Sequence, residues 1–330
     1  MRVETVSKKK FECRFTREGV SADAAVTIEK EGLVINLPAE KKSVFFDYAD
    51  LYDFRLLNYH LFLDRVDETW EISQLGYDTE EFFERLWEAY DARSREALFL
   101  SGAPLMETEG DFHFEEENAA AKGKAKIALY PDCVCILPHN ACARRIPLCF
   151  TEEPAREGFR IFLKLDTGEK YEIARLGHDT DPFFENMTKR RQAVLQAWEK
   201  RLAELRPQNA FTEIFPDAVS GLFRPEDEGF WMAAVKDGRA AVEFFTDEKA
   251  ATYLYSFDAD VKTFTAILRH AMEATGTHRE LIYLDEDKLN ENPVYRMAVV
   301  RSRYVRFLRA HMAGRVIHTA AWGDRVREQV

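Results

Sequence analysis

ISQLGYDTEEFFE at residues 72–84 returns as IARLGHDTDPFFE at residues 173–185. Eight of the thirteen positions are identical, whereas unrelated stretches of average composition would share about one. The match extends upstream, where FECRF (11–15) faces DFHFE (111–115) and VTIEKEGLVINLP (26–38) faces KIALYPDCVCILP (126–138). The 330-residue chain therefore contains two copies of one unit, which we place at residues 1–104 and 105–205.

Each unit is predicted to hold several strands followed by one helix. Apolar and polar residues alternate in the first copy, for example through Leu33, Ile35 and Leu37. This period of two is typical of half-buried strands. The turns between the predicted strands are short and polar, which favours antiparallel hairpins because parallel strands need long crossovers.

The duplicated stretch joins the last strand to the helix. Gly76 and Gly177 stand where the chain turns, and glycine tolerates the backbone angles of a tight turn. A side-chain oxygen of Asp78 or Thr79, and of Asp179 or Thr180, is expected to cap the helix.

Apolar residues follow with helical spacing, and we expect Phe83 and Phe184 to be equivalent buried residues. The second helix continues to Trp198, about 20 Å beyond Phe184 at 1.5 Å per residue. A small sheet can hardly cover both, so we expect Trp198 to dock on the C-terminal domain.

The C-terminal third, residues 206–330, is predicted to be a mixed α+β domain that begins with a Pro-bearing linker, 206–229. A short helix is expected near 217–223, three strands over 230–257 and a helix over 260–274. Further strands are expected at 280–284, at YRMAVVR (295–301) and at GRVIHTA (314–320), with a helix over 304–313. The acidic stretch DEDKLNEN (285–292) lacks the glycine of a calcium loop, so it is interpreted as a solvated turn.

About 100 residues with six or seven antiparallel strands and one C-terminal amphipathic helix resemble the pleckstrin-homology-like (PH-like) fold. This resemblance covers residues 8–100 and 108–204. It rests on RRIPLCF (144–150) and on the segments LGYDT and LGHDT, each of which leads into a helix that begins with two phenylalanines. The fold class is therefore α+β, with two tandem PH-like β-sandwich or barrel domains, each capped by its helix. The whole chain resembles uncharacterised bacterial proteins that have two such repeats and a distinct C-terminal domain. No activity is carried over from that group. The resemblance to PH-like domains implies binding of lipids, peptides or proteins rather than catalysis.

The charge of the chain, −12 at pH 7, argues against binding to nucleic acid or to a membrane. One basic cluster, Lys8, Lys9, Lys10 and Arg14, is a candidate contact for an anion. In the second copy the negative charges of Glu115, Glu116 and Glu117 argue against an anionic ligand. Lys122, Lys124 and Lys126 are the only positive charges in that stretch that would favour one.

The absence of an apolar N-terminal segment and of a long apolar run, together with five cysteines, predicts a cytoplasmic protein.

No motif in the sequence specifies a reaction. GxGxxG, GxxxxGK[ST], HExxH and GxSxG are all missing, so no catalytic residue and no cofactor is predicted. The best metal candidates are Cys133, Cys135, His139 and Cys142. The first two are expected to share one face of a strand as small hydrophobic residues, in the places of Leu33 and Ile35, and no bound metal is predicted.

Two function classes remain open. The first is a non-enzymatic binding or scaffolding protein that presents PH-like surfaces to a protein partner or to another copy of itself. The alternative is an enzyme with its site in the C-terminal domain or at its junction, using His278, His318 or the acidic stretch. A minor third interpretation is binding of anionic lipid through Lys8 to Lys10.

Overall fold

The computed structural model describes residues 9–116, 119–165, 168–203, 219–223, 230–236, 239–245, 252–258, 284–302, 305–306, 309 and 313–317. Side chains are described for residues 9–116, 119–165 and 168–197 of the first two units, and for residues 284–302, 305–306 and 309 of the last third. The side chain of Trp198, the helix predicted over 260–274 and all but the last residue of the strand predicted over 280–284 lie outside this description. Most residues of the helix predicted over 304–313 also lie outside it.

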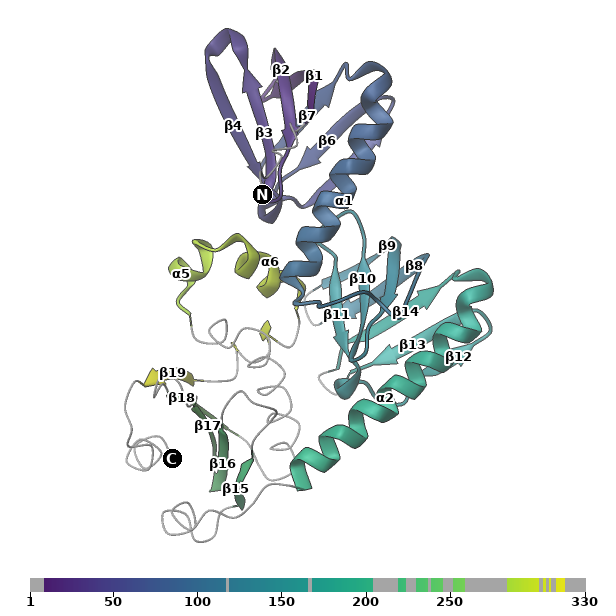
Figure 1. The fold of residues 1–330 in the computed structure, drawn as a ribbon, viewed down its shortest axis with the longest axis vertical. Helices are drawn as coiled ribbons and strands as arrows, with labels where there is room; N and C mark the ends of the chain where they lie inside the picture. Colours follow the sequence, from purple (N-terminus) through teal and green to yellow (C-terminus); the bar gives the residue numbers. More distant parts are fainter. Residues whose placement is uncertain are drawn as a thin grey trace, which may run out of the picture.

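One curled antiparallel sheet of seven strands, in the order β4-β3-β2-β1-β7-β6-β5, forms repeat 1, and helix α1 follows it (Figure 1). The strands are β1 (Lys10–Arg17), β2 (Val20–Ile28), β3 (Gly32–Leu37), β4 (Lys42–Asp47), β5 (Asp53–Leu57), β6 (His60–Asp64) and β7 (Thr69–Ser73). Three short 3-10 turns, η1 (Pro38–Glu40), η2 (Tyr48–Asp50) and η3 (Gly76–Asp78), and helix α1 (Thr79–Ala97) complete the repeat.

Repeat 2 has the same topology, with the sheet order β11-β10-β9-β8-β14-β13-β12. Its elements are β8 (Met106–Glu116), β9 (Ala119–Leu129), β10 (Cys133–Leu137), β11 (Arg144–Pro147), η4 (Leu148–Phe150), β12 (Ala155–Glu157), β13 (Arg160–Lys164), β14 (Lys170–Ala174), η5 (Gly177–Asp179) and α2 (Thr180–Ala203). The prediction of two tandem antiparallel units, each with a helix after its sheet, is confirmed.

Strand pairing corrects the alignment of the first strands. Ile72 lies opposite Phe15 in repeat 1, and its counterpart Ile173 lies opposite Phe112 in repeat 2. Phe15 is therefore equivalent to Phe112, and the alignment of residues 11–15 with 111–115 is wrong. The physical reason is a longer hairpin, because β8 and β9 have 11 residues each and β1 has 8.

The entry into each helix is a tight turn with a left-handed glycine. Gly76 and Gly177 have φ values of 59° and 60°, as the turn prediction requires. The predicted capping by a carboxylate is wrong for Asp78, whose side chain makes no cap at the start of α1. In repeat 2 the Asp179 carboxylate accepts a hydrogen bond from the Thr108 hydroxyl at 2.8 Å. The Thr79 hydroxyl donates to the Gly76 carbonyl at 2.8 Å instead, and Thr180 repeats this contact on Gly177 at 2.9 Å.

The two helices bury one aromatic face each. Phe82, Leu86 and Tyr90 are fully buried in the core of repeat 1, and Phe183 and Met187 are buried in repeat 2. Phe83 and Phe184 are only half-buried, so the expectation that they are the equivalent core residues is off by one position.

A third antiparallel sheet, in the order β15-β16-β17-β18-β19, belongs to the C-terminal third. Its strands are β15 (Val219–Phe223), β16 (Phe230–Lys236), β17 (Arg239–Phe245), β18 (Thr252–Asp258) and β19 (Ala313–Ile317). The three strands predicted over 230–257 and the last strand are confirmed. The helix predicted near 217–223 is wrong, since β15 pairs with β16 there.

Two short helices, α5 (Glu286–Asn290) and α6 (Pro293–Arg301), replace the predicted acidic turn and the predicted strand YRMAVVR. The reason is local. Pro293 occupies the first turn of α6, and the Asn292 side chain accepts hydrogen bonds from the backbone N–H of Val294 and Tyr295. Both residues are strong helix-start signals and outweigh the strand propensity of the valines.

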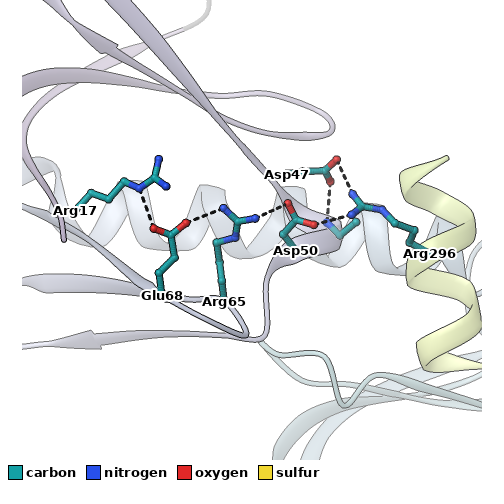
Figure 2. Close-up of polar contacts among 7 residues, drawn as sticks. Arg17, Asp47, Asp50, Arg65, Glu68 and Arg296 are labelled. Carbon is teal, nitrogen blue, oxygen red and sulfur yellow. Dashed lines mark hydrogen bonds and ion pairs between the residues drawn. The ribbon is translucent and has the colours of Figure 1, made fainter. Parts of the chain in front are cut away.

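Helix α6 lies between the two repeats. Met297 is buried in the core of repeat 1, whereas the neighbouring Ala298 is buried in the core of repeat 2. Arg296 donates to Asp50 at 2.7 Å and to Asp47 at 3.3 Å. Figure 2 shows that these contacts continue from Asp50 through Arg65 and Glu68 to Arg17 on β1.

No helix in the described part of the chain is both long and apolar enough to cross a bilayer.

Met297→Ala should destabilise the protein by about 2–5 kcal/mol, because truncating a buried methionine leaves a cavity. Val300→Ala on the same helix is the matched control, since Val300 is 46% exposed. Urea unfolding should show a clear loss for the first variant and little change for the second. Equal effects would contradict the burial of α6 between the repeats.

Candidate functional site

Helix α1 packs against both repeats. Beyond its last turn, Leu98 is fully buried on the outer face of the second sheet, in a cluster with Ala128, Tyr130, Cys133, Cys135, Leu137 and Ala143. The Arg95 guanidinium donates to the Tyr130 hydroxyl at 2.7 Å and to Glu107 at 2.6 Å. These contacts place the C-terminal end of α1 against repeat 2 (Figure 1).

The two cysteines of β10 lie under this helix end rather than in the core of repeat 2. Their Sγ atoms are 3.8 Å apart, and burial raises the pKa of Cys133, so it stays a thiol. Val134 and Ile136, not the cysteines, are equivalent to Leu33 and Ile35, so that alignment is wrong by one residue.

The other metal candidates lie apart from this pair. His139 stands among aromatic rings, and half-buried Cys142 donates its backbone N–H to the Asn140 side chain at 2.9 Å. Within the described residues no group of three or more His, Cys, Asp or Glu side chains is arranged to hold a metal ion. The absence of a metal stays a prediction.

His139 reaches from the β10–β11 loop of repeat 2 into repeat 1. Its ring centroid lies 3.7 Å from that of Trp87, 5.3 Å from Phe54 and 5.8 Å from Phe83. Lys126 occupies a face of Trp87, with Nζ 4.7 Å from the ring centroid. Burial, and secondarily the charge of Lys126, lowers the pKa of His139, so the imidazole is neutral at pH 7.

A cleft opens beside this aromatic cluster. Its inner part, of about 410 Å³, is lined by Trp87, Glu109, Asp111, Lys124, His139 and Arg175. An outer part of about 600 Å³ adjoins it, lined by Asp111, His113, Lys122, Phe159, Arg160 and Glu172. The two parts share Asp111, Lys124 and Arg175, so they form one cleft over the outer face of β8, β9 and β14 of repeat 2. We call it the inter-repeat cleft because Trp87 of repeat 1 closes its inner end.

Most charges in the inter-repeat cleft are paired with each other. Arg175 lies 3.1 Å from Asp111, and Arg160 lies 3.2 Å from Glu172. Lys122 and Lys124 are exposed and have no ion pair with any residue the structure describes. Phe159, 73% exposed, stands at the outer end.

Glu115 and Glu116, whose charges argue against an anionic ligand in the sequence, do not pair with Lys122 or Lys124 in the described structure. Glu116 is buried and binds Arg144 at 2.8 Å and Arg306 at 2.7 Å, and these two arginines hold its pKa below the usual range. Glu115 lies opposite Ala120 on β9, and Glu117 lies outside the described residues. The alternating lysines were visible in the sequence, but the burial of Glu116 was not.

The N-terminal basic cluster is not an open patch in the described part. Lys9 binds Asp78 at 2.9 Å and Glu81 at 2.6 Å, and Arg14 lies 3.4 Å from Asp23. Lys10 is exposed, and Lys8 lies outside the described residues.

Comparison with known proteins adds no family. Neither a scan against models of protein families nor a search of curated proteins returns a match.

The lowered pKa of His139 predicts a pH dependence of stability. The unfolded chain takes up a proton near pH 6.5, whereas folded His139 takes it up only at lower pH. The unfolded state therefore binds more protons in that window, and stability should fall as the pH drops below about 6.5.

Urea unfolding of the wild type and of His139→Phe, between about pH 5 and pH 8, measures this effect. The variant should lose part of the dependence on pH. The control His178→Tyr, which copies the exposed Tyr77 of repeat 1, should keep it. An unchanged profile in His139→Phe would refute the assignment.

Proposed function

We propose that this chain is a non-enzymatic binding or scaffolding protein with two PH-like domains, and that its inter-repeat cleft receives a segment of a protein partner. The cleft is the observation that supports this proposal most. It combines about 600 and 410 Å³ of concave space with aromatic rings at both ends and a few polar groups between them, as binding sites commonly do.

The chemistry of the lining residues favours binding over catalysis. Catalytic sites need a nucleophile or base in hydrogen-bond reach of an orienting group. The ring of His139 contacts Trp87, Phe54 and Phe83 and has no hydrogen bond to any described residue. Arg160 and Arg175 are already held by carboxylates.

The enzyme alternative rests on His278, His318 and the acidic stretch. Both histidines lie outside the described residues, and the acidic stretch folds into α5. Binding of anionic lipid through the N-terminal cluster is weakened by the carboxylates that hold Lys9 and Arg14. A protein partner therefore remains the preferred ligand.

A photo-crosslinking amino acid at position 159 should capture a defined polypeptide in an extract of the native host. The same probe at Val20, which is 69% exposed on repeat 1, is the matched control. Excess unlabelled wild-type protein should abolish the crosslink, because it competes for the same partner. A product at twice the chain mass of 38.3 kDa would identify a second copy as the partner.

Identical products from both positions, or a product that the unlabelled protein does not compete away, would contradict the proposal.

A further inference from the structure

We infer that the inter-repeat cleft selects an acidic, extended peptide segment, with carboxylates at alternate positions that pair with Lys122 and Lys124. This inference rests on the proposed function and names the chemistry of the partner.

The row of lysines on β9 sets the spacing. Lys122, Lys124 and Lys126 alternate with residues that face inward, so all three lie on the outer face of the sheet. A strand rises about 3.4 Å per residue, which separates successive lysines by about 7 Å. Residues i and i+2 of an extended peptide have the same separation, so two acidic side chains can face two lysines.

The protein itself shows how the last lysine of the row is satisfied. Lys126 lies 3.6 Å from Asp91 of α1, and its ammonium stands over the ring of Trp87. An acidic residue and an aromatic residue from α1 thus cover one end of the row. The other two lysines continue into the open cleft, where a partner with the same two residue types fits.

On the equivalent surface of repeat 1 the polar side chains already have partners within the repeat. The counterparts of Lys122 and Lys124 are Ser21 and Asp23. Ser21 is hydrogen-bonded to Thr16 at 2.8 Å, and Asp23 pairs with Arg14.

In repeat 2 the residues opposite the lysines leave them unpaired. His113 stands opposite Lys122 and offers no negative charge. Asp111 stands opposite Lys124 but binds Arg175. Among the described residues, repeat 2 thus keeps two ammonium groups without an ion pair at a place where repeat 1 has Ser21 bonded to Thr16 and Asp23 paired with Arg14.

An acidic peptide fits this surface better than a nucleic acid. Asp111 and Glu172 already pair with Arg175 and Arg160, so among the described residues the cleft offers only Lys122 and Lys124 as unpaired cations. A continuous row of phosphates finds too few partners there, and the net charge of −12 repels it. Two spaced carboxylates need only the two lysines, and exposed Phe159 offers contact for an apolar side chain next to them.

A random heptapeptide display library, selected against the intact protein, tests the inference. Enriched peptides should carry Asp or Glu at alternate positions and an aromatic or apolar residue. The double variant K122E/K124E should weaken their binding at least about tenfold, and binding should weaken with added salt. K41E/K42E, at exposed lysines of repeat 1, should bind as the wild type does.

The outcomes separate this inference from the proposed function. Peptides that lose binding in Phe159→Ala but are not acidic, or that bind K122E/K124E equally well, would overturn the inference and leave the cleft as a binding site. A single-stranded oligonucleotide that binds as tightly as the acidic peptides would also overturn it. Peptides insensitive to Phe159→Ala, or no enrichment at all, would count against the proposed function itself.

Discussion

The burial of helix α1 in two places at once is the constraint on which the rest of the structure depends. Phe82, in its first turn, fills the core of repeat 1, and Leu98, just past its end, is buried on the outer face of repeat 2. Nineteen helical residues span about 28 Å, and a helix of this length is stiff. We therefore expect two repeats joined through such a helix to take one relative position. The inter-repeat cleft follows, because α1 covers only part of the second sheet and leaves Trp87 at the margin.

Helix α6 completes this junction from the far end of the chain. The burial of Met297 and Ala298 stabilises this junction more than the ion pairs of Arg296 do. Those ion pairs are partly exposed, and exposed ion pairs add little to stability. Arg301 is different, since it is 1% exposed and donates to the Tyr90 hydroxyl at 2.8 Å without a carboxylate among the described residues. A buried guanidinium with few partners costs stability, and we expect it to favour the one orientation of α6 in which it reaches the Tyr90 hydroxyl.

The fold was largely predictable from one internal comparison, because LGYDT and LGHDT carry a glycine turn and a helix start whose chemistry is local. The first strand was misaligned because FECRF and DFHFE both alternate aromatic and polar residues, and a longer hairpin leaves no mark in such a pattern. YRMAVVR has strand propensity, and only Asn292 and Pro293 before it indicate a helix. The cleft was not predictable as a whole. Its aromatic residues, Trp87, His139 and Phe159, come from three separate segments that only tertiary packing brings together. The alternation of Lys122 and Lys124 was the one part of the cleft that the sequence indicated.

The distance between spin labels at Tyr77→Cys and His178→Cys, equivalent exposed sites of the two repeats, tests the shared helix most directly. Cys142 is replaced by serine in this background, because the other described cysteines are buried. Pulsed electron paramagnetic resonance should give one narrow distance distribution, and Leu98→Asp should broaden it by releasing α1 from the second sheet. A broad distribution in the parent protein, or a narrow one that Leu98→Asp leaves unchanged, would contradict the account.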